Sequence, residues 1–142
     1  MKISQKAEYA LRAMLELALR IENSQATRNA DIARQQHIPE KFLELILVEL
    51  RRAGLIKSQR GPEGGHRLAR PPREISVGDI WRAIDGSSRE NSILDTSGRH
   101  SDPFKSVWEE VDKAIAGVVN KVSLADMLKR AETRRGVADY NI

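Results

Sequence analysis

The sequence contains no cysteine, and this absence excludes several kinds of chemistry at once. Disulfide bonds, zinc–thiolate sites, thiol catalysis and ordinary iron–sulfur clusters all need cysteine side chains. Aromatic residues make up only 4% of the chain, so a modest, mainly aliphatic core is expected. No apolar run is long enough to span a membrane, and no secretory signal peptide precedes the amphipathic sequence. We therefore expect a soluble, cytoplasmic protein.

Positive charge is concentrated in the first half of the chain. Residues 1–73 carry 14 Lys and Arg against 8 Asp and Glu, whereas residues 74–142 carry 10 against 12. This asymmetry is typical of a module that meets a polyanion with one end, but a solvated surface with chance asymmetry explains it equally well. Charge alone therefore leaves both interpretations open.

The first half of the chain is predicted to hold three helices and a hairpin. Apolar residues recur at helical spacing over three stretches, 4–21, 28–36 and 39–53. Ser4 and Thr27 are candidate N-caps. Pro39 suits the first turn of a helix, so a short turn with a buried Ile38 separates the second helix from the third.

The third predicted helix has an apolar inner stripe and a different outer face. Its outward side chains are Lys41, Glu44, Leu45, Val48, Arg51 and Arg52. Gly54 is placed to take the left-handed conformation that ends a helix. A strand over 55–60, a Gly/Pro-rich turn over 61–65 and a returning strand over 66–69 then predict a hairpin.

The second half is predicted to be helical on both sides of a polar loop. The expected elements are a helix over 77–86 capped by Ser76, a loop over 87–102, the longest helix opened by Asp102-Pro103, a capping box at Ser123, a short helix ending near 132 and a flexible tail over 133–142. The fold class is therefore mainly α with a small β-hairpin wing.

Helix, helix, short turn, helix and hairpin is the order of elements in a winged helix-turn-helix, which we assign to residues 1–86. The major groove of B-DNA admits one helix, where Glu44 can accept from a cytosine amino group and Lys41 can donate to guanine or phosphate. The hairpin is predicted to bring an arginine to the minor groove and backbone to phosphates. The predicted DNA-binding residues are Lys2, Thr27, Arg28, Lys41, Glu44, Arg51, Arg60, Gly61, Gly64, Gly65 and His66. The alternatives are an ordinary hairpin with a solvated arginine, and a Thr27 that only caps a helix.

The long helix over 103–122 has an apolar face wider than a small winged domain can cover. The predicted dimer interface is Phe104, Val107, Trp108, Val111, Ile115, Val118 and Val119. Burying this face against a symmetry mate makes a homodimer, which predicts a pseudo-palindromic operator. Folding back on the first helix is the alternative, and we expect the face to make both contacts.

Several motifs together resemble the Rrf2 family of bacterial regulators. They include Glu8-Tyr9-Ala10-Leu11-Arg12, Ile38-Pro39, Leu50-Arg51-Arg52-Ala53-Gly54-Leu55-Ile56 and, most specifically, the wing Arg60-Gly61-Pro62-Glu63-Gly64-Gly65-His66-Arg67-Leu68-Ala69. The resemblance covers about residues 1–130 and implies a dimeric repressor, which in some members is also an activator, with Lys41 and Glu44 on the recognition helix and Arg60 in the minor groove. His66 departs from the family's usual tyrosine.

The larger departure is in the loop over 87–102, where many members of this family hold an iron–sulfur cluster on three cysteines. Serines and Asp102 stand there instead, so we predict no cluster and no other cofactor. Either the chain belongs to a cysteine-free branch with an unidentified small-molecule or protein effector, or its cysteines have been changed to serine. His100, Asp95, Asp102 and Glu90 could hold a hard metal ion, but a polar loop with one histidine is more often merely solvated.

Two other function classes compete with DNA binding. A protein-interaction regulator controlled by a partner enzyme would use the C-terminal helix as its docking face. An enzyme would need a positioned nucleophile or acid–base set, and three scattered histidines without cysteine or a phosphate loop argue against one. Among these classes the sequence favours a DNA-binding transcriptional regulator.

Overall fold

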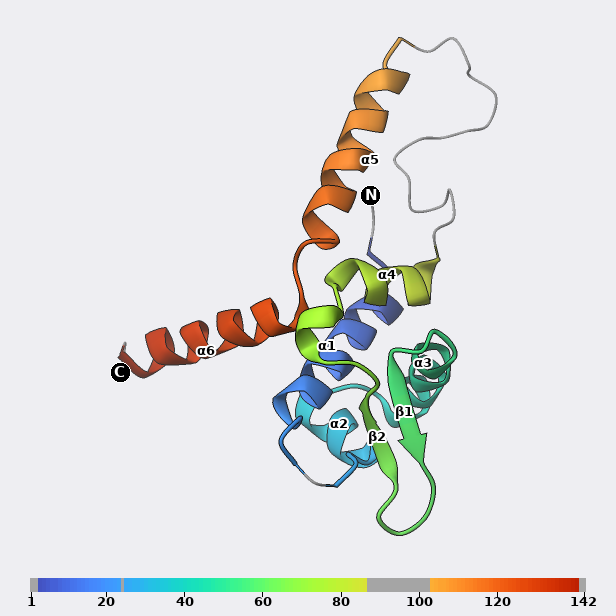
Figure 1. Cartoon of the computed structure of the whole chain (residues 1–142), viewed down its shortest axis with the longest axis vertical. Coiled ribbons are helices and arrows are strands. Elements are labelled where there is room, and N and C mark those ends of the chain that lie inside the picture. Colours follow the sequence, from blue (N-terminus) through green and yellow to red (C-terminus); the bar gives the residue numbers. More distant parts are fainter. Residues whose placement is uncertain (1–2, 24, 87–102, 141–142) are drawn as a thin grey trace.

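The computed structural model describes residues 3–23, 25–86 and 103–140, and the side chains of these residues as far as 136. Six helices, one 3-10 turn and one hairpin make up the described chain (Figure 1). Their bounds are α1 (Gln5–Leu19), α2 (Asn29–Gln36), α3 (Glu40–Arg52), β1 (Ile56–Gln59), β2 (Gly65–Leu68), η1 (Pro72–Glu74), α4 (Val77–Asp85), α5 (Lys105–Val119) and α6 (Leu124–Tyr140). The fold is mainly helical with a winged helix-turn-helix, as predicted.

Helix α1 lies at the centre of the fold and packs against α2, α3, α4, α6 and β2. Its buried face is made of small or flexible side chains, Ala7, Ala10, Ala13, Met14, Leu17 and Ala18, which let the neighbouring helices approach closely. The rest of the core is aliphatic, and its fully buried members include Ile32, Leu43, Ile46, Leu50, Ile75 and Ile80. A core of this kind agrees with the low aromatic content of the sequence.

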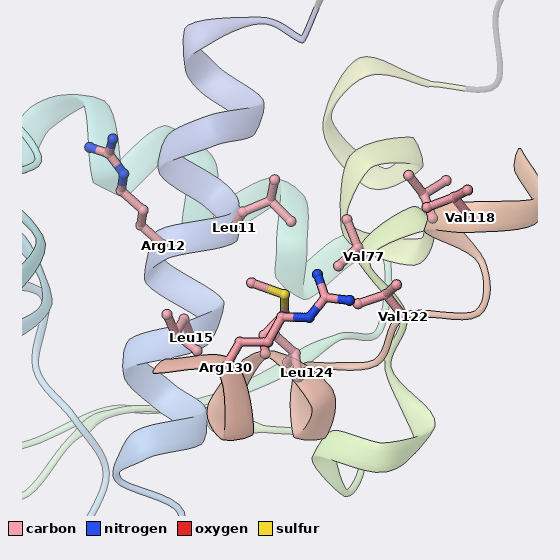
Figure 2. Close-up of a pocket in the computed structure, with 10 residues that line it drawn as sticks. Leu11, Arg12, Leu15, Val77, Val118, Val122, Leu124 and Arg130 are labelled. Atoms are coloured by element: carbon pink, nitrogen blue, oxygen red, sulfur yellow. The ribbon is translucent and has the colours of Figure 1, made fainter. Parts of the chain in front are cut away.

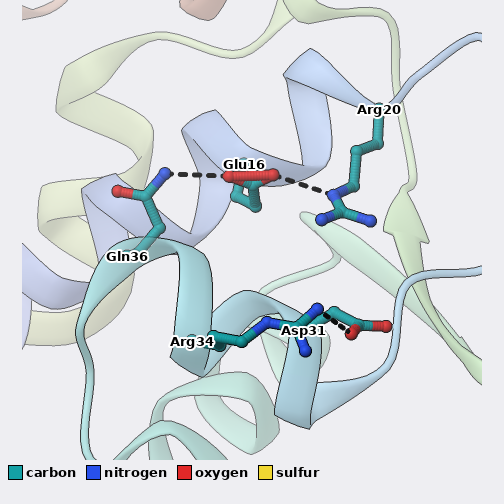
Figure 3. Close-up of polar contacts among 5 residues, drawn as sticks. All are labelled: Glu16, Arg20, Asp31, Arg34 and Gln36. Carbon is teal, nitrogen blue, oxygen red and sulfur yellow. Dashed lines mark hydrogen bonds and ion pairs between the residues drawn. The ribbon is translucent and has the colours of Figure 1, made fainter.

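A buried carboxylate ties α1 to α2 (Figure 3). Glu16 is only 7% exposed, yet both of its oxygens are satisfied. Arg20 donates to one oxygen at 2.8 Å, and the Gln36 amide donates to the other at 3.0 Å. A buried charge needs such partners, because an unpaired carboxylate would be costly to remove from water. The hydrogen bond from Gln36 to Glu16 therefore fixes the position of α2 against α1.

The ends of the elements follow local signals in the sequence. Ser4, Ser76 and Ser123 accept the predicted capping hydrogen bonds, and the last two form complete capping boxes. Gly54 has φ +76°, and the Leu55 N–H donates to the Leu50 carbonyl at 3.0 Å, which closes α3 as a Schellman motif. The predicted helix stop at Gly54 is thus confirmed.

The C-terminal helices differ from the prediction. Helix α5 begins at Lys105 rather than at 103, and Asp102, its predicted cap, lies outside the described residues. Helix α6 does not stop near 132 but continues to Tyr140, so with 17 residues it is longer than α5. Apolar periodicity fades after the first turns of α6, but alanine, leucine, lysine, arginine and glutamate are strong helix formers and no proline interrupts them.

The position of α5 is the second difference. The helix extends from the end of the molecule opposite the hairpin tip (Figure 1), and none of its residues is buried. It is α6, not α5, that packs on α1, because Leu124 begins α6 fully buried in the core. Backbone bonds hold this junction in place, since Val77 donates to Val122 and Leu124 donates to Ile75, each at 2.8 Å. The expected packing of the long helix on the first helix is therefore wrong in its main part.

Candidate nucleic-acid interface

Helix α3 presents an exposed face opposite its core stripe. The turn before it is tight, because His37 takes a left-handed conformation with φ +54° and the Ile38 N–H donates to the Ala33 carbonyl at 2.9 Å. Ile38 is buried, as predicted, and pins α3 against α2. All six predicted outward side chains are exposed: Lys41, Glu44, Leu45, Val48, Arg51 and Arg52. They lie at spacings of three and four residues, so one stripe of the helix carries them.

The sequence prediction gave no role to the two apolar members of this stripe. Leu45 is 62% exposed and Val48 is 37% exposed, between the acidic Glu44 and the basic end of the helix. Single exposed aliphatic residues are ordinary, but here they stand in the middle of the face predicted to meet base edges. The sequence pattern already placed both side chains outward, and outward apolar side chains can indicate contact with thymine, which presents a methyl group in the major groove.

The hairpin beside α3 has a tip that requires glycine. Strands β1 and β2 pair antiparallel, with Ile56 opposite Leu68 and Gln59 opposite Gly65, and β1 packs against α3. Gly64 is buried, and a Cβ atom there would lie 2.3 Å from the Gln59 carbonyl oxygen. Gly65 has φ +148°, and its Cβ would lie 2.4 Å from the Thr27 carbonyl oxygen. A side chain at either position would force the wing apart.

The wing is attached to the start of α2 by Thr27, His66 and Arg28, for which the sequence predicted helix capping or DNA contact. Thr27 pairs with His66 as a β-bridge, with backbone N–O distances of 3.0 and 2.8 Å. Thr27 is only 6% exposed and does not cap α2, whose N-cap is Arg28 without a side-chain bond. The predicted cap is therefore wrong, and the buried side chain of Thr27 is poorly placed for a phosphate. The backbone of Thr27 is instead satisfied by its bridge to His66 in β2. No local sequence pattern predicts a pairing between residues so far apart in the chain.

His66 and Arg28 complete this fastening. The Nδ1 atom of His66 lies 2.7 Å from the Ser58 hydroxyl, and its Nε2 atom bonds the Asn29 side-chain oxygen. Because that amide oxygen only accepts, Nε2 carries the proton and Nδ1 accepts from Ser58. Burial lowers the pKa of His66, and the charge of Arg51 lowers it further, so the neutral ring is favoured. The Arg28 guanidinium donates to the Pro62 carbonyl at the wing tip.

A polar hollow of about 370 Å³ lies between the wing and the first residues of α2. Arg28, Asn29, Gly61, Gly64 and His66 are among the residues that line it. Arg60, the residue before Gly61, is exposed. The structure thus gathers most of the predicted DNA-binding residues around α3 and the wing, whereas Lys2 lies outside the described residues.

Helix α5 carries the predicted dimer face largely uncovered. Phe104 and Val118 are 62% and 63% exposed, and Val107 and Trp108 are 44% and 40% exposed. Val111, Ile115 and Val119 are half-buried. So many large apolar side chains on one helix are unusual on the surface of a protein.

In the part of the chain that the structure describes, no helix is long and apolar enough to cross a membrane.

Comparison with known proteins gives a consistent result. A family model, Rrf2, described as an iron-dependent transcriptional regulator, matches residues 3–130. The HTH-type transcriptional regulator IscR of Vibrio atlanticus is 33% identical over 135 residues, which cover 93% of this chain and 78% of the relative. The solved structure of T. potens IscR is similar with a TM-score of 0.78 and 42% identity, covering 94% of this chain and 90% of that one. CymR, described as the global cysteine regulator of B. subtilis, has a TM-score of 0.78 and 32% identity, covering 92% and 98%.

The iron in the family's description does not fit the donors that this chain offers. Iron–sulfur clusters are held by thiolates, and the sequence has no cysteine. Within residues 3–23, 25–86 and 103–140, no group of three or more histidine, aspartate or glutamate side chains is arranged to hold a metal ion. The four residues considered for a hard metal, Glu90, Asp95, His100 and Asp102, lie outside the described residues.

Proposed function

Because the chain belongs to the Rrf2 family of transcriptional regulators, we propose that it binds a pseudo-palindromic operator as a homodimer and represses transcription. One observation carries the DNA-binding part. The exposed stripe of α3 and the glycine-tipped wing adjoin each other, since α3 packs against β1, and together they carry most of the predicted contact residues. A recognition helix enters the major groove while a wing contacts the neighbouring backbone or minor groove.

The stripe of α3 supplies base contacts of three chemical kinds. Glu44 accepts from a cytosine amino group, and Lys41 donates to guanine or to phosphate. Leu45 and Val48 meet thymine methyl groups, which are the apolar feature of the major groove. Arg51 and Arg52, in the last turn of α3, contact phosphates. The preferred half-site therefore contains cytosine next to thymine.

The wing supplies the backbone and minor-groove contacts. Arg60 reaches the minor groove, where a narrow A/T-rich segment attracts arginine. Gly61, Gly64 and Gly65 let the wing backbone approach phosphates in the polar hollow beside Arg28. His66 uses both ring nitrogens within the protein, so we assign it the role of positioning the wing instead of touching DNA.

The exposed face of α5 supplies the dimer interface. Phe104, Val107, Trp108 and Val118 are too exposed and too numerous for a solvated helix. A two-fold axis along this face buries the same residues of both copies and leaves both wings at the far end of the molecule (Figure 1). Two DNA-binding domains related in this way fit two half-sites one or more helical turns apart.

Binding to duplex DNA across a range of salt concentrations tests this proposal. Selection from a random DNA pool first yields the operator, and its Kd is then measured between about 50 and 200 mM salt. If six or more phosphates are contacted, the affinity falls by about 10³-fold or more over this range. The variant Arg60→Ala should bind more weakly and lose its preference for A/T-rich flanks, whereas Arg134→Ala on α6 should not. No enrichment of any sequence and no salt dependence would refute the proposal.

The repressor role rests on the family resemblance and needs its own assay. A promoter that overlaps the selected operator is transcribed in vitro with and without the protein. Repression predicts fewer transcripts from this promoter and unchanged transcripts from a promoter whose half-sites are scrambled. More transcripts from the intact promoter would make the protein an activator.

A further inference from the structure

The apolar hollow in Figure 2 is part of the proposed dimer face and is not a separate site. It lies between α1, α6 and the end of α5. Val118 and Val119 line it and belong to the face that a second copy is proposed to cover. A polar hollow of about 170 Å³ shares no lining residue with it.

This polar hollow lies where the end of α1, the segment before α2 and strand β2 meet. Arg20 lines it from the end of α1, Thr27 from the segment before α2, and Arg67 from β2. No aspartate or glutamate is among the described residues that line it, and this holds for Glu22 in the same segment. Hydrogen-bond donors therefore surround the hollow without a carboxylate among them.

The hydroxyl group of Thr27 is an unsatisfied donor in this wall. Thr27 is only 6% exposed, and its backbone is bonded to that of His66. Its hydroxyl, however, forms no hydrogen bond with any residue that the structure describes. A hydroxyl that is buried without a partner is costly, so a group inside the hollow that accepts its hydrogen bond would be stabilised there.

Two guanidinium groups stand beside this hydroxyl. Arg20 uses its Nε atom to hold Glu16 at 2.8 Å (Figure 3), and neither of its Nη atoms bonds a described residue. Since Glu16 balances the charge of Arg20, the net positive charge of the hollow comes from Arg67. The Arg67 guanidinium donates to the Asn23 carbonyl at 3.4 Å, which places it over the segment that borders the hollow. His66 also lines the hollow, but both of its ring nitrogens are engaged elsewhere.

We propose that this hollow binds a free tetrahedral oxyanion, phosphate or sulfate, between Arg20, Thr27 and Arg67. The three donors come from three parts of the chain, and a tetrahedral oxyanion offers each of them an oxygen of its own, whereas a carboxylate has only two. A phosphate within a DNA strand carries its backbone on both sides, so it is too bulky to reach the buried hydroxyl of Thr27.

The bound ion would act on the wing, and this link rests on the proposed function. An ion held by Arg67 and Arg20 joins β2 to the end of α1, on the opposite side of the Thr27 bridge from the bonds of His66 to Ser58 and Asn29. A wing that is already held in place loses less freedom when it binds DNA. The ion should therefore raise the affinity for the operator.

Calorimetric titration of the full chain without DNA tests the site by itself. The probes are sodium sulfate and sodium phosphate, with the ionic strength kept constant by sodium chloride. We expect saturable binding of at least one of the two ions. Arg67→Gln should weaken this binding about tenfold, as expected for loss of a hydrogen bond from a charged group. The control Arg73→Gln removes the same charge from an exposed position outside the hollow and should leave the binding unchanged.

A second variant, Thr27→Val, removes the hydroxyl and keeps the backbone bridge to His66. Because this hydroxyl has no partner among the described residues, the unfolding temperature should not fall, yet ion binding should weaken about fivefold. A role of Thr27 in the fold alone would not give this combination. Absence of saturable binding by either ion, or equal binding to the wild type and to Arg67→Gln, would overturn the proposal. If Thr27→Val does not fold, Arg67→Gln alone decides.

Operator affinity, measured with and without the ion at one ionic strength, tests the link to the wing. It should rise for the wild type and not for Arg67→Gln. An ion that binds by calorimetry but leaves operator affinity unchanged would remove the link and keep the site. If neither ion binds the free chain while Arg67→Gln lowers the salt dependence of DNA binding by about one phosphate, the phosphate belongs to DNA and the free-ion site is overturned. If no operator exists, the calorimetric result still stands, so failure of the two proposals can be told apart.

Discussion

Replacing Leu45 by alanine removes an apolar side chain from the centre of the proposed recognition stripe without touching the core. Leu45 is 62% exposed in the free protein, so its truncation leaves no buried cavity in α3. The folded protein should therefore unfold at nearly the same temperature as the wild type. Any loss of DNA affinity would then report contact with DNA and not a loss of structure.

The magnitude of this loss follows from the exposed fraction. Burying a whole leucine side chain contributes about 1.5–3 kcal/mol, and the 62% that remains to be buried at Leu45 contributes about 1–2 kcal/mol of this. Since about 1.4 kcal/mol corresponds to a factor of ten, Leu45→Ala should weaken operator binding about 5- to 30-fold. Binding to random duplex DNA should not change, because phosphate contacts dominate it.

The sharper assay removes the partner group on the DNA. Each thymine of the selected operator is replaced in turn by deoxyuridine, which lacks only the methyl group, and Kd is measured by fluorescence anisotropy. Loss of one buried methyl corresponds to about 0.8 kcal/mol, or about fourfold in Kd. We expect this penalty at one or two thymines for the wild type, and almost none at the same thymines for Leu45→Ala, because the two losses are coupled.

Two results would refute this reasoning. If no deoxyuridine substitution weakens binding of the wild type, Leu45 meets no thymine methyl. If the substitution weakens binding of Leu45→Ala as strongly as that of the wild type, the methyl group is read by another side chain. Val48→Ala, with 37% of its surface left to bury, would be the next variant to compare.

Three further predictions concern the wing and the dimer. Gly65→Ala should destabilise the fold by about 1–3 kcal/mol because of its positive φ and the 2.4 Å approach to a carbonyl, and Gly136→Ala, which meets no atom within 4 Å, is the control in thermal unfolding. Since the pKa of His66 is lowered below 6.5 by burial and then by the charge of Arg51, its contribution to stability should be complete above pH 6.5 and lost as the pH falls from 6.5 toward the folded-state pKa. His66→Gln should flatten this part of the stability curve; an unaltered curve would contradict the assignment. Trp108→Ala or Ile115→Asp should give monomers in sedimentation, and a dimer that survives both changes would remove α5 as the interface.

The sequence was informative where the relevant interactions are local. Apolar residues three and four apart predicted α1 to α4, and Ser4, Ser76 and Gly54 predicted where helices begin and end. The outward stripe of α3 was predicted completely, because the side of a helix that faces the core fixes the side that faces solvent. The glycines of the wing were also predicted from a local constraint, since a tight hairpin tip limits which residues can occupy it.

The errors fall where distant parts of the chain meet. Thr27 has the residue type of an N-cap, but pairing with His66 gave its backbone a better partner 39 positions away. The length of α6 was missed because helix propensity, and not an apolar stripe, continues it to Tyr140. The bonds of His66 to Ser58 and Asn29 could not be predicted from the sequence, since they join residues from separate elements.

The sequence by itself determined the order of the elements, the exposed face of α3 and the absence of thiolate ligands, because each depends on residue type and short-range spacing. Only the tertiary structure decided that α6 covers α1, that α5 stands apart with its apolar face uncovered, and that the wing is fastened to α2. Which apolar surfaces pair depends on the shapes and positions of whole elements in space, and this competition for burial is not encoded within any single segment.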